Sequence, residues 1–138
     1  MNSEGRSKQT GVQQRSFTFA LRVIKLCQTL DSLAGVARTL SWQLLRAGTS
    51  IGANLAEARS AQSRADFVNK LEVALKEARE TAYWLDLLAE ARIVAPGRLG
   101  DMRAEVEEIT RMLAASVIST KRKRQAVNPD IRTQTSER

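Results

Sequence analysis

Apolar residues recur along most of the chain at steps of three and four, the spacing of an α-helix that buries one face. Regular alternation of apolar and polar residues, which would indicate strands, is not visible. Both prolines fall where the apolar pattern is interrupted, so long helices are expected in the rest of the chain. The pattern predicts four helices, at about residues 16–33, 40–59, 64–93 and 102–121.

Each predicted helix carries a stripe of apolar residues that we expect to face a common core. Four helices with short connections, none of them apolar on every side, favour an all-α, antiparallel up-and-down four-helix bundle. The stripes, in chain order, are Phe17, Leu21, Ile24, Cys27 or Gln28, and Leu30; Leu40, Leu44, Ala47, Ile51 and Leu55; Phe67, Leu71, Ala74, Ala78, Leu85 and Leu88; and Met102, Val106, Ile109, Leu113 and Val117.

Local signals place some boundaries of the bundle. Ser63 and Asp66 form a helix start signal, which predicts that the third helix begins at Arg64. The segment 94–100 contains Pro96 and Gly97 and is predicted to be a turn. Residues 1–14 and 125–138 are rich in polar and charged residues, so we expect a basic N-terminal tail and a C-terminal tail, both disordered, around a bundle of residues 15–124.

The chain has 138 residues, of which 43% are hydrophobic, enough for one packed core and too few residues for two ordinary domains. Its single cysteine, Cys27, excludes an internal disulfide and is expected to be a small core residue. No signal peptide and no membrane-spanning segment are expected, which favours a location in the reducing cytoplasm.

The formal net charge of +7 arises entirely from the two ends of the sequence. Residues 1–22 contribute +3 and residues 121–138 contribute +4, whereas the residues between them are neutral. Attraction to a polyanion would therefore come chiefly from the ends. The candidate nucleic-acid-binding residues are Arg15, Arg22, Lys121, Arg122, Lys123 and Arg124. If the C-terminal segment proves dispensable for binding, the alternative site is on the body, at Arg46, Arg59 and Arg64.

Histidine is absent, which removes the commonest acid–base catalyst and the Glu-x-x-His pairs of di-metal bundles. The sequence has no glycine-rich phosphate-binding loop of either common type. A cluster of Glu57, Glu77 and Glu80 is geometrically conceivable, but solvated or salt-bridged carboxylates are the simpler interpretation. We therefore expect no enzymatic activity, no metal and no cofactor.

Two features of the predicted helices differ from an ordinary bundle. Arg46, Ser50, Asn54 and Glu57 form a polar stripe on the second helix, which also contains Gly48 and Gly52. Glycine within a helix costs about 1 kcal/mol relative to alanine, so close contact with another helix is a plausible reason for it. We favour a polar network against another helix, of the same chain or of another subunit, over an ordinary solvent-facing surface.

Tyr83 and Trp84 are the second feature, because adjacent residues on a helix cannot both face one core. Aromatic residues of this kind are enriched at protein interfaces and also stack on nucleobases. For a neutral helix face, an oligomer interface is the commoner explanation.

Four segments together resemble those of a known family: RSFTFALRVIKL, QLLRAGTSIGANLAEA, AQSRADFVNKLEVALKEARETAYWLDLL and RMLAASVISTKRK. The chain is similar over about residues 15–123 to the four helix bundle proteins first noticed as open reading frames in 23S rRNA intervening sequences. The resemblance implies a left-handed antiparallel bundle, assembly into ring-like pentamers and no recognised catalytic activity in most members. The chain is also distantly similar to the accessory variability proteins of diversity-generating retroelements. Those proteins are strongly basic and bind a reverse transcriptase and nucleic acid. The neutral body of this chain departs from that branch.

Two hypotheses for function follow from these observations. The first is a homo-oligomeric binding protein, pentameric as the resemblance implies, that contacts RNA, DNA or a ribonucleoprotein through its basic ends. The second is a structural or adaptor oligomer with a protein partner, such as an accessory subunit of a reverse transcriptase, whose tails serve solubility.

Overall fold

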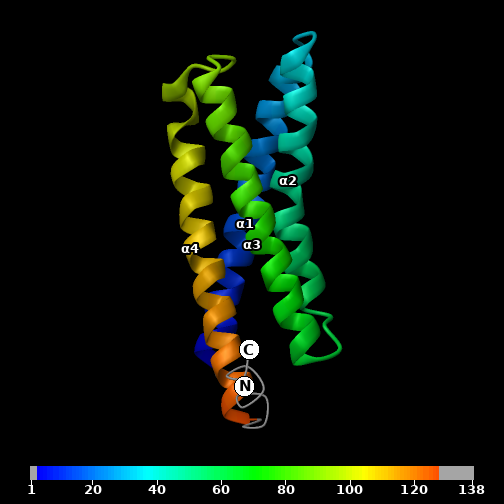
Figure 1. Cartoon of the computed structure of the whole chain (residues 1–138), viewed down its shortest axis with the longest axis vertical. Coiled ribbons are helices and arrows are strands. Elements are labelled where there is room, and N and C mark those ends of the chain that lie inside the picture. The colour runs from blue at the N-terminus through cyan, green and yellow to red at the C-terminus, as the bar shows by residue number, and fades with distance from the viewer. Residues whose placement is uncertain (1–2, 128–138) are drawn as a thin grey trace, which may run out of the picture.

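The computed structural model describes the backbone of residues 3–127 and the side chains of residues 11–123. It contains four helices, α1 (Ser3–Asp31), α2 (Val36–Ala58), α3 (Arg64–Glu90) and α4 (Pro96–Val127). Successive helices run in opposite directions and are joined by short turns (Figure 1). No strand occurs between residues 3 and 127. The predicted all-α, up-and-down four-helix bundle is confirmed.

The core contains the apolar stripes predicted for the second, third and fourth helices. All five stripe residues of α4 are buried, as are Leu44, Ala47, Ile51 and Leu55 of α2. Leu40 and Phe67 are half-buried and pack against this core. The three-and-four spacing of apolar residues therefore identifies the inward face of these helices correctly.

The stripe predicted for the first helix is wrong over most of its length. Phe17, Leu21 and Ile24 are exposed by 61%, 49% and 37%. A different set faces the core, namely Val12, Ser16, Phe19, Val23, Cys27 and Leu30, of which only Cys27 and Leu30 were predicted. Because α1 is apolar on two faces, hydrophobicity alone does not decide which of them is buried.

Close packing of α1 on α2 determines which face of α1 is buried. A Cβ atom at Gly48 would lie 2.9 Å from both Cγ atoms of Val23, so only glycine allows this approach without a shift. Further along the same contact, Ser41 Oγ donates a hydrogen bond to the carbonyl oxygen of Cys27 at 3.3 Å. The Cys27 thiol in turn donates to the carbonyl oxygen of Ser41 at 3.4 Å. The close helix contact predicted from the mid-helix glycine is confirmed at Gly48.

Three helices begin earlier than the sequence predicted, of which α2 differs least, since it starts at Val36 rather than at about residue 40. α1 starts at Ser3, so residues 3–14 are helical rather than part of a disordered tail, and Val12 is in the core. α4 starts at Pro96, inside the segment predicted to be a turn. Proline is favoured at the first position of a helix, where its missing N–H is not needed and its fixed φ suits the helix.

Other boundaries differ less from the predictions. α3 begins at Arg64 as predicted, because Ser63 Oγ accepts a hydrogen bond from the Asp66 N–H at 3.0 Å and caps the helix. α3 ends at Glu90 rather than near residue 93. α4 continues to Val127, so residues 125–127 of the predicted C-terminal tail are helical, and its remaining residues lie outside the described part.

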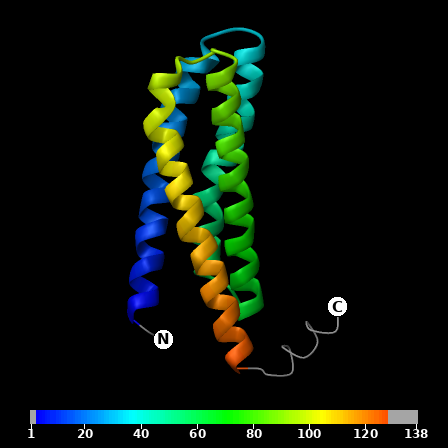
Figure 2. The same cartoon turned by 60° about the vertical axis from the view of Figure 1, so that its left-hand side comes forward.

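The up-and-down topology gives the bundle two different ends. The α2–α3 turn, the start of α1 and the end of α4 lie together at one end, whereas the α1–α2 and α3–α4 turns lie at the other (Figures 1 and 2). α4 diverges from α1 toward the first of these ends (Figure 2). Between residues 3 and 127, no helix combines the length and the apolar character needed to cross a bilayer.

Candidate nucleic-acid interface

The predicted C-terminal basic run lies on the last turns of α4. Lys121, Arg122 and Lys123 are exposed. Lys121 Nζ pairs with Glu72 Oε1 of α3 at 2.6 Å, so its charge is partly engaged. Arg122 and Lys123 have no acidic partner among the described side chains. The side chain of Arg124 lies outside the described residues.

The α2–α3 turn places two further cations at the same end of the bundle. Arg59 follows the last residue of α2, and Arg64 is the first residue of α3. Both are exposed, and neither has an acidic partner among the described residues. The sequence analysis placed the site at the ends of the chain and named these two arginines, with Arg46, only as the alternative site on the body. The up-and-down topology could have joined them to the C-terminal cations, because it brings the second helix–helix turn to the end where α4 finishes.

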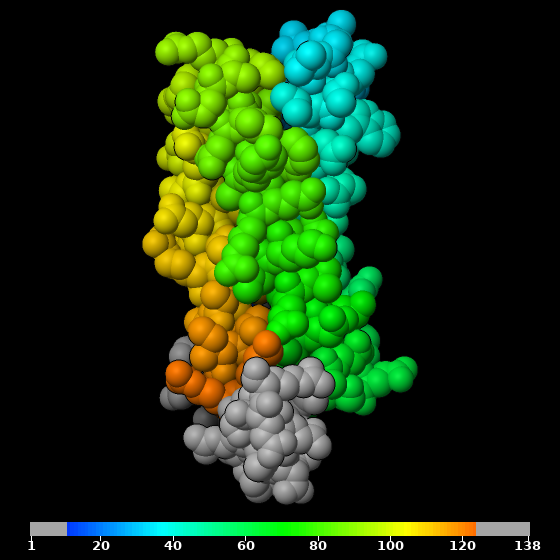
Figure 3. Space-filling model, viewed as in Figure 1, coloured from blue at the N-terminus to red at the C-terminus, as the bar shows by residue number. Residues whose placement is uncertain are grey.

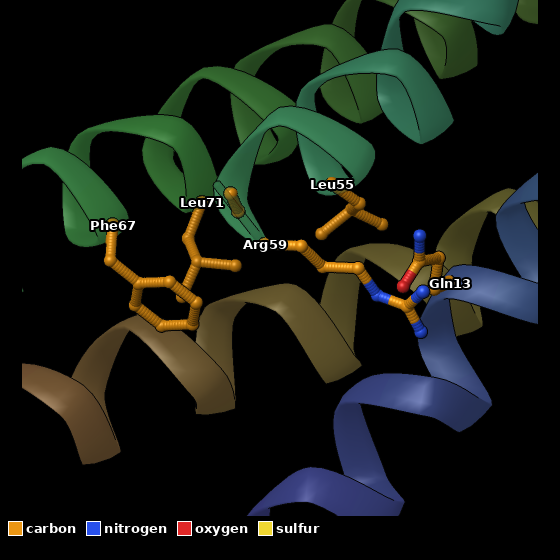
Figure 4. Close-up of a pocket in the computed structure, with 6 residues that line it drawn as sticks. Gln13, Leu55, Arg59, Phe67 and Leu71 are labelled. Carbon is orange, nitrogen blue, oxygen red and sulfur yellow. The ribbon is translucent and has the colours of Figure 1, made fainter. Parts of the chain in front are cut away.

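Arg59 lies across a small depression at this end of the bundle. The depression has a volume of about 10 Å³ and is lined by Gln13, Leu55, Ala58, Arg59, Phe67 and Leu71. The Arg59 side chain extends from α2 toward Gln13 of α1 (Figure 4). A space of this size holds no more than a single water molecule, so it is not a ligand pocket. The guanidinium group is instead presented at the surface.

The acids at this end are already engaged by other groups. Glu57 Oε2 pairs with Lys70 Nζ at 2.8 Å, and this contact raises the pKa of Lys70. Asp66 accepts a hydrogen bond from the Gln62 N–H at 3.3 Å, and Glu72 pairs with Lys121. Among the described side chains at this end, Asp66 has no cationic partner, and the other unpaired charges are positive. We call Arg59, Arg64, Arg122 and Lys123 together the basic end.

Arg15 and Arg22, predicted to bind nucleic acid, do not belong to the basic end. Arg15 forms a two-bond salt bridge with Glu105 of α4, with both N–O distances at 2.9 Å. The hydrogen bond from Arg15 lowers the pKa of Glu105. Arg15 therefore joins α1 to α4, and Arg22 is exposed further along α1.

The predicted polar stripe of α2 lies beside α3 of the same chain. Arg46 contacts both Glu80 and Glu77, the latter with Nη1 and Oε2 at 3.6 Å. Ser50 Oγ donates to the carbonyl oxygen of Arg46 at 2.6 Å, and Asn54 Nδ2 donates to that of Ser50 at 2.8 Å. At the far end of the stripe, Glu57 pairs with Lys70. Arg46 and Glu57 thus form ion pairs with α3, whereas Ser50 and Asn54 donate hydrogen bonds to the backbone of α2 itself.

Burial and the neighbouring Glu80 raise the pKa of the half-buried Glu77.

The two aromatic residues on α3 have different surroundings. Tyr83 is 56% exposed, whereas Trp84 is half-buried against the core. Their rings meet edge to face with centroids 5.2 Å apart. Among the described residues, no group of three or more acids and cysteine forms a possible metal site.

Comparison with known proteins identifies a matching family model and similar solved structures. The family model of the 23S rRNA-intervening sequence protein matches residues 8–115. A crystal structure of a protein of unknown function from the S23 ribosomal protein family of Bacteroides thetaiotaomicron is 42% identical in sequence, with a TM-score of 0.74. The alignment covers 80% of this chain and 97% of that one. No curated protein matches the sequence.

Proposed function

The chain belongs to the 23S rRNA-intervening sequence protein family, and from this premise we propose that it is a non-catalytic, homo-oligomeric protein that binds nucleic acid through the basic end of its bundle. The family name and the structural relative specify no ligand. The proposal is therefore supported by the distribution of charge on the described surface.

The observation that carries the proposal is the set of cations without acidic partners at one end of the molecule. Arg122 and Lys123 project from α4, and Arg59 and Arg64 project from the α2–α3 turn. Arginine and lysine at an exposed surface bind phosphate groups largely without regard to base sequence. The expected ligand is a flexible or single-stranded nucleic acid, which can follow four charges without a preformed groove.

Oligomerisation would strengthen this weak site. Four cations in one copy give little affinity at physiological salt, but several copies that present the same end raise the effective concentration of sites along one polyanion. A pentamer, as the resemblance implies, would provide five such ends. The buried thiol of Cys27 suits a protein that works in the cytoplasm, because it forms no disulfide.

The test is a double charge reversal, Arg122→Glu with Lys123→Glu. Binding to a fluorescent single-stranded RNA should weaken by more than about tenfold. The slope of the logarithm of affinity against the logarithm of salt concentration should decrease by about 1.4, because two phosphate contacts are lost. Fluorescence anisotropy over a salt series measures both quantities.

The matched control is Arg92→Glu with Arg98→Glu, two exposed arginines at the opposite end of the bundle. It changes the net charge equally and should alter affinity by less than about twofold. If both variants weaken binding equally, net charge rather than the basic end is responsible. If the intact chain does not bind RNA at physiological salt, the nucleic-acid proposal is wrong, and the structural or adaptor role with a protein partner replaces it.

A further inference from the structure

The exposed apolar residues of the bundle are concentrated on the α1–α2 hairpin. Of the exposed large apolar residues in the described part of the chain, Tyr83 and Ile118 lie on α3 and α4, and the rest are Phe17, Leu21, Ile24, Leu33, Val36 and Trp42. Three of these form a row on α1 at steps of four and three, which we call the outer stripe: Phe17, Leu21 and Ile24. Exposed apolar rows of this kind mark contacts with other molecules.

The outer stripe has a neutral border on the side where α2 packs against α1. A Cβ atom at Gly48 would meet the side chain of Val23, and one at Gly52 would lie 3.9 Å from the backbone nitrogen of Phe17. Residues 47–56 of α2 carry no charge, and the exposed residues among them are both alanines, Ala53 and Ala56. This border therefore consists of small, uncharged side chains.

The opposite border of the outer stripe is basic. Arg22 and Lys25 each follow a stripe residue by one position, which places them on the side of α1 that faces away from α2. Both are exposed, and neither forms an ion pair with a described acid. The hydrogen bond from Arg15 and the charge of Arg22 lower the pKa of Glu105 on α4, but Arg15 already binds both oxygens of that carboxylate. The positive charge of this border is therefore available to an outside partner.

The hairpin as a whole is also positively charged. Residues 11–56 contain five bases and one acid, Asp31, which pairs with Arg38 at 3.5 Å. Residues 57–120 contain nine bases and eleven acids. Those residues include α3 and most of α4, which cover much of the face shown in Figure 3. An acidic partner is therefore attracted to the hairpin side of the molecule more than to the α3–α4 side.

The described surface of a second copy offers no match for the outer stripe. Tyr83 and Ile118 lie on different helices and form no apolar row. Asp86 and Glu107, the acids that line the groove between α3 and α4, are already in ion pairs. Packing one outer stripe on another would bring the basic borders of both copies together, which is unfavourable. The matching surface therefore belongs to a different molecule.

We propose that the outer stripe is a docking surface for an acidic amphipathic helix of another protein. The apolar residues of the partner, at the same steps of three and four, pack on the stripe and on the neighbouring alanines of α2. Its carboxylates pair with Arg22 and Lys25 on one side only. The stripe spans about two turns, which suits one crossing helix better than the broad apolar face of a helix embedded in a lipid surface. This site goes beyond the proposed function, because it lies outside the basic end.

A pair of synthetic peptides tests the chemistry of the partner. The acidic peptide has about 18 residues, with leucines at steps of three and four and glutamates elsewhere, and the basic peptide has lysines in place of the glutamates. In anisotropy titrations with the intact chain, the acidic peptide should bind at least about tenfold more tightly than the basic one. Equal affinities, or no binding of the acidic peptide, would overturn the inference and leave RNA binding at the basic end untouched.

Leu21→Glu tests the position of the docking surface. It places an acid in the middle of the outer stripe and should weaken binding of the acidic peptide by more than about tenfold. Val36→Glu introduces the same acid at an exposed position outside the stripe and should alter affinity by less than about twofold. The double variant Arg122→Glu with Lys123→Glu should also keep its affinity within about twofold, because the peptide does not use the basic end. Unchanged binding by Leu21→Glu, or greater loss in either control, would place the peptide elsewhere and overturn the inference.

A change of charge sign tests the basic border. Arg22→Gln with Lys25→Glu reverses the sign of this border without placing a second acid beside Glu105. The variant should bind the basic peptide more tightly than the acidic one, whereas Arg92→Gln with Arg98→Glu, the same change at exposed positions near the α3–α4 turn, should keep the original preference. Circular dichroism should show the helix content of the wild type in both variants. A border variant that still prefers the acidic peptide would contradict the proposed pairing.

Three further measurements on Leu21→Glu identify other occupants of the outer stripe. A smaller particle mass than the wild type by light scattering would show that the stripe joins copies of the chain. Binding of the wild type, but not of the variant, to sedimented phosphatidylglycerol vesicles would make the stripe a lipid-binding surface. A loss of RNA affinity as large as that of Arg122→Glu with Lys123→Glu would make it part of the nucleic-acid site. Each of these results would overturn the inference, and the expected result is no change in mass, no vesicle binding and RNA affinity within about threefold of wild type.

Discussion

At the scale of single residues, the α1–α2 contact shows where hydrophobic pattern stops being informative. Phe17 and Leu21 on one side of α1 are as apolar as Phe19 and Val23 on the other. The face that is buried is the one that fits against the small residues of α2, above all Gly48. A pattern of apolar residues indicates hydrophobicity but not shape. The sequence therefore predicted correctly that this segment is a helix, but it predicted the wrong buried face.

The two mid-helix glycines of α2 should respond oppositely to alanine. In Gly48→Ala the new methyl group would lie 2.9 Å from two carbons of Val23, so the core must shift, at a cost of about 1–3 kcal/mol. In Gly52→Ala the nearest atoms lie at 3.8 Å or beyond, an ordinary contact. The higher helix propensity of alanine should then stabilise the protein by up to about 1 kcal/mol. Urea unfolding of both variants measures the difference, and equal effects would contradict the close approach at Gly48.

At the scale of helices, the boundaries that were predicted well are those fixed by local chemistry. The start of α3 depends on a cap formed by Ser63 and Asp66, so the four-residue segment 63–66 suffices to specify it. The start of α1 depends instead on contacts with distant parts of the chain, such as the burial of Val12. Pro96 was interpreted as part of a turn, although proline is also common at the first position of a helix. Only the packing of Leu99 and Met102 in the core distinguishes these two roles.

The salt bridge between Arg15 of α1 and Glu105 of α4 makes a prediction about pH. Arg15 lowers the pKa of Glu105 in the folded chain. The pair therefore stabilises the fold above the unfolded pKa of Glu105, and this stabilisation is lost as the pH falls through the folded pKa. Glu105→Gln should lower the melting temperature at pH 7, and the difference from wild type should shrink as the pH falls below the ordinary pKa of a glutamate, about 4.3, and close once the pH is below the lowered folded pKa. Circular dichroism melts over a series of pH values test this.

Glu77 provides a contrast of opposite sign for the same experiment. Burial and Glu80 raise its pKa, so its ionised form opposes folding above its unfolded pKa, and the penalty disappears as the pH falls. Glu77→Gln should therefore raise the melting temperature at pH 7. A lower melting temperature for this variant would show that the attraction between Glu77 and Arg46 outweighs burial.

At the scale of the whole molecule, the arrangement of helices changes the meaning of the charge distribution. The sequence shows a neutral body between basic ends, which led us to assign binding to the terminal segments. In the folded bundle, Arg59 and Arg64 belong to that nominally neutral body, but they lie at the end where α4 finishes. The fold itself could be predicted from the periodicity of apolar residues. The four cations of the basic end could not be grouped in this way, because their grouping depends on the topology of the bundle and on which nearby acids are already paired.

A site that includes the α2–α3 turn predicts an effect that a site confined to the end of α4 does not. Arg59→Glu with Arg64→Glu should weaken single-stranded RNA binding by more than about threefold, although both residues are far in sequence from Lys121–Lys123. Removal of residues 121–138 should weaken it further in the same variant. Anisotropy titrations of the variant, the truncation and their combination decide the matter. An unchanged affinity in the double variant would confine the site to α4 and the residues after it.

The up-and-down topology also bears on how the protein should be handled in the laboratory. α1 begins and α4 finishes at the end that carries the proposed binding residues (Figure 1). An affinity tag or fluorescent fusion joined directly to the start of α1 or the end of α4 would therefore lie close to this end, and an acidic linker there would compete with an RNA ligand for the cations. The α3–α4 turn at residues 91–95 lies at the opposite end and is the better place to attach a reporter.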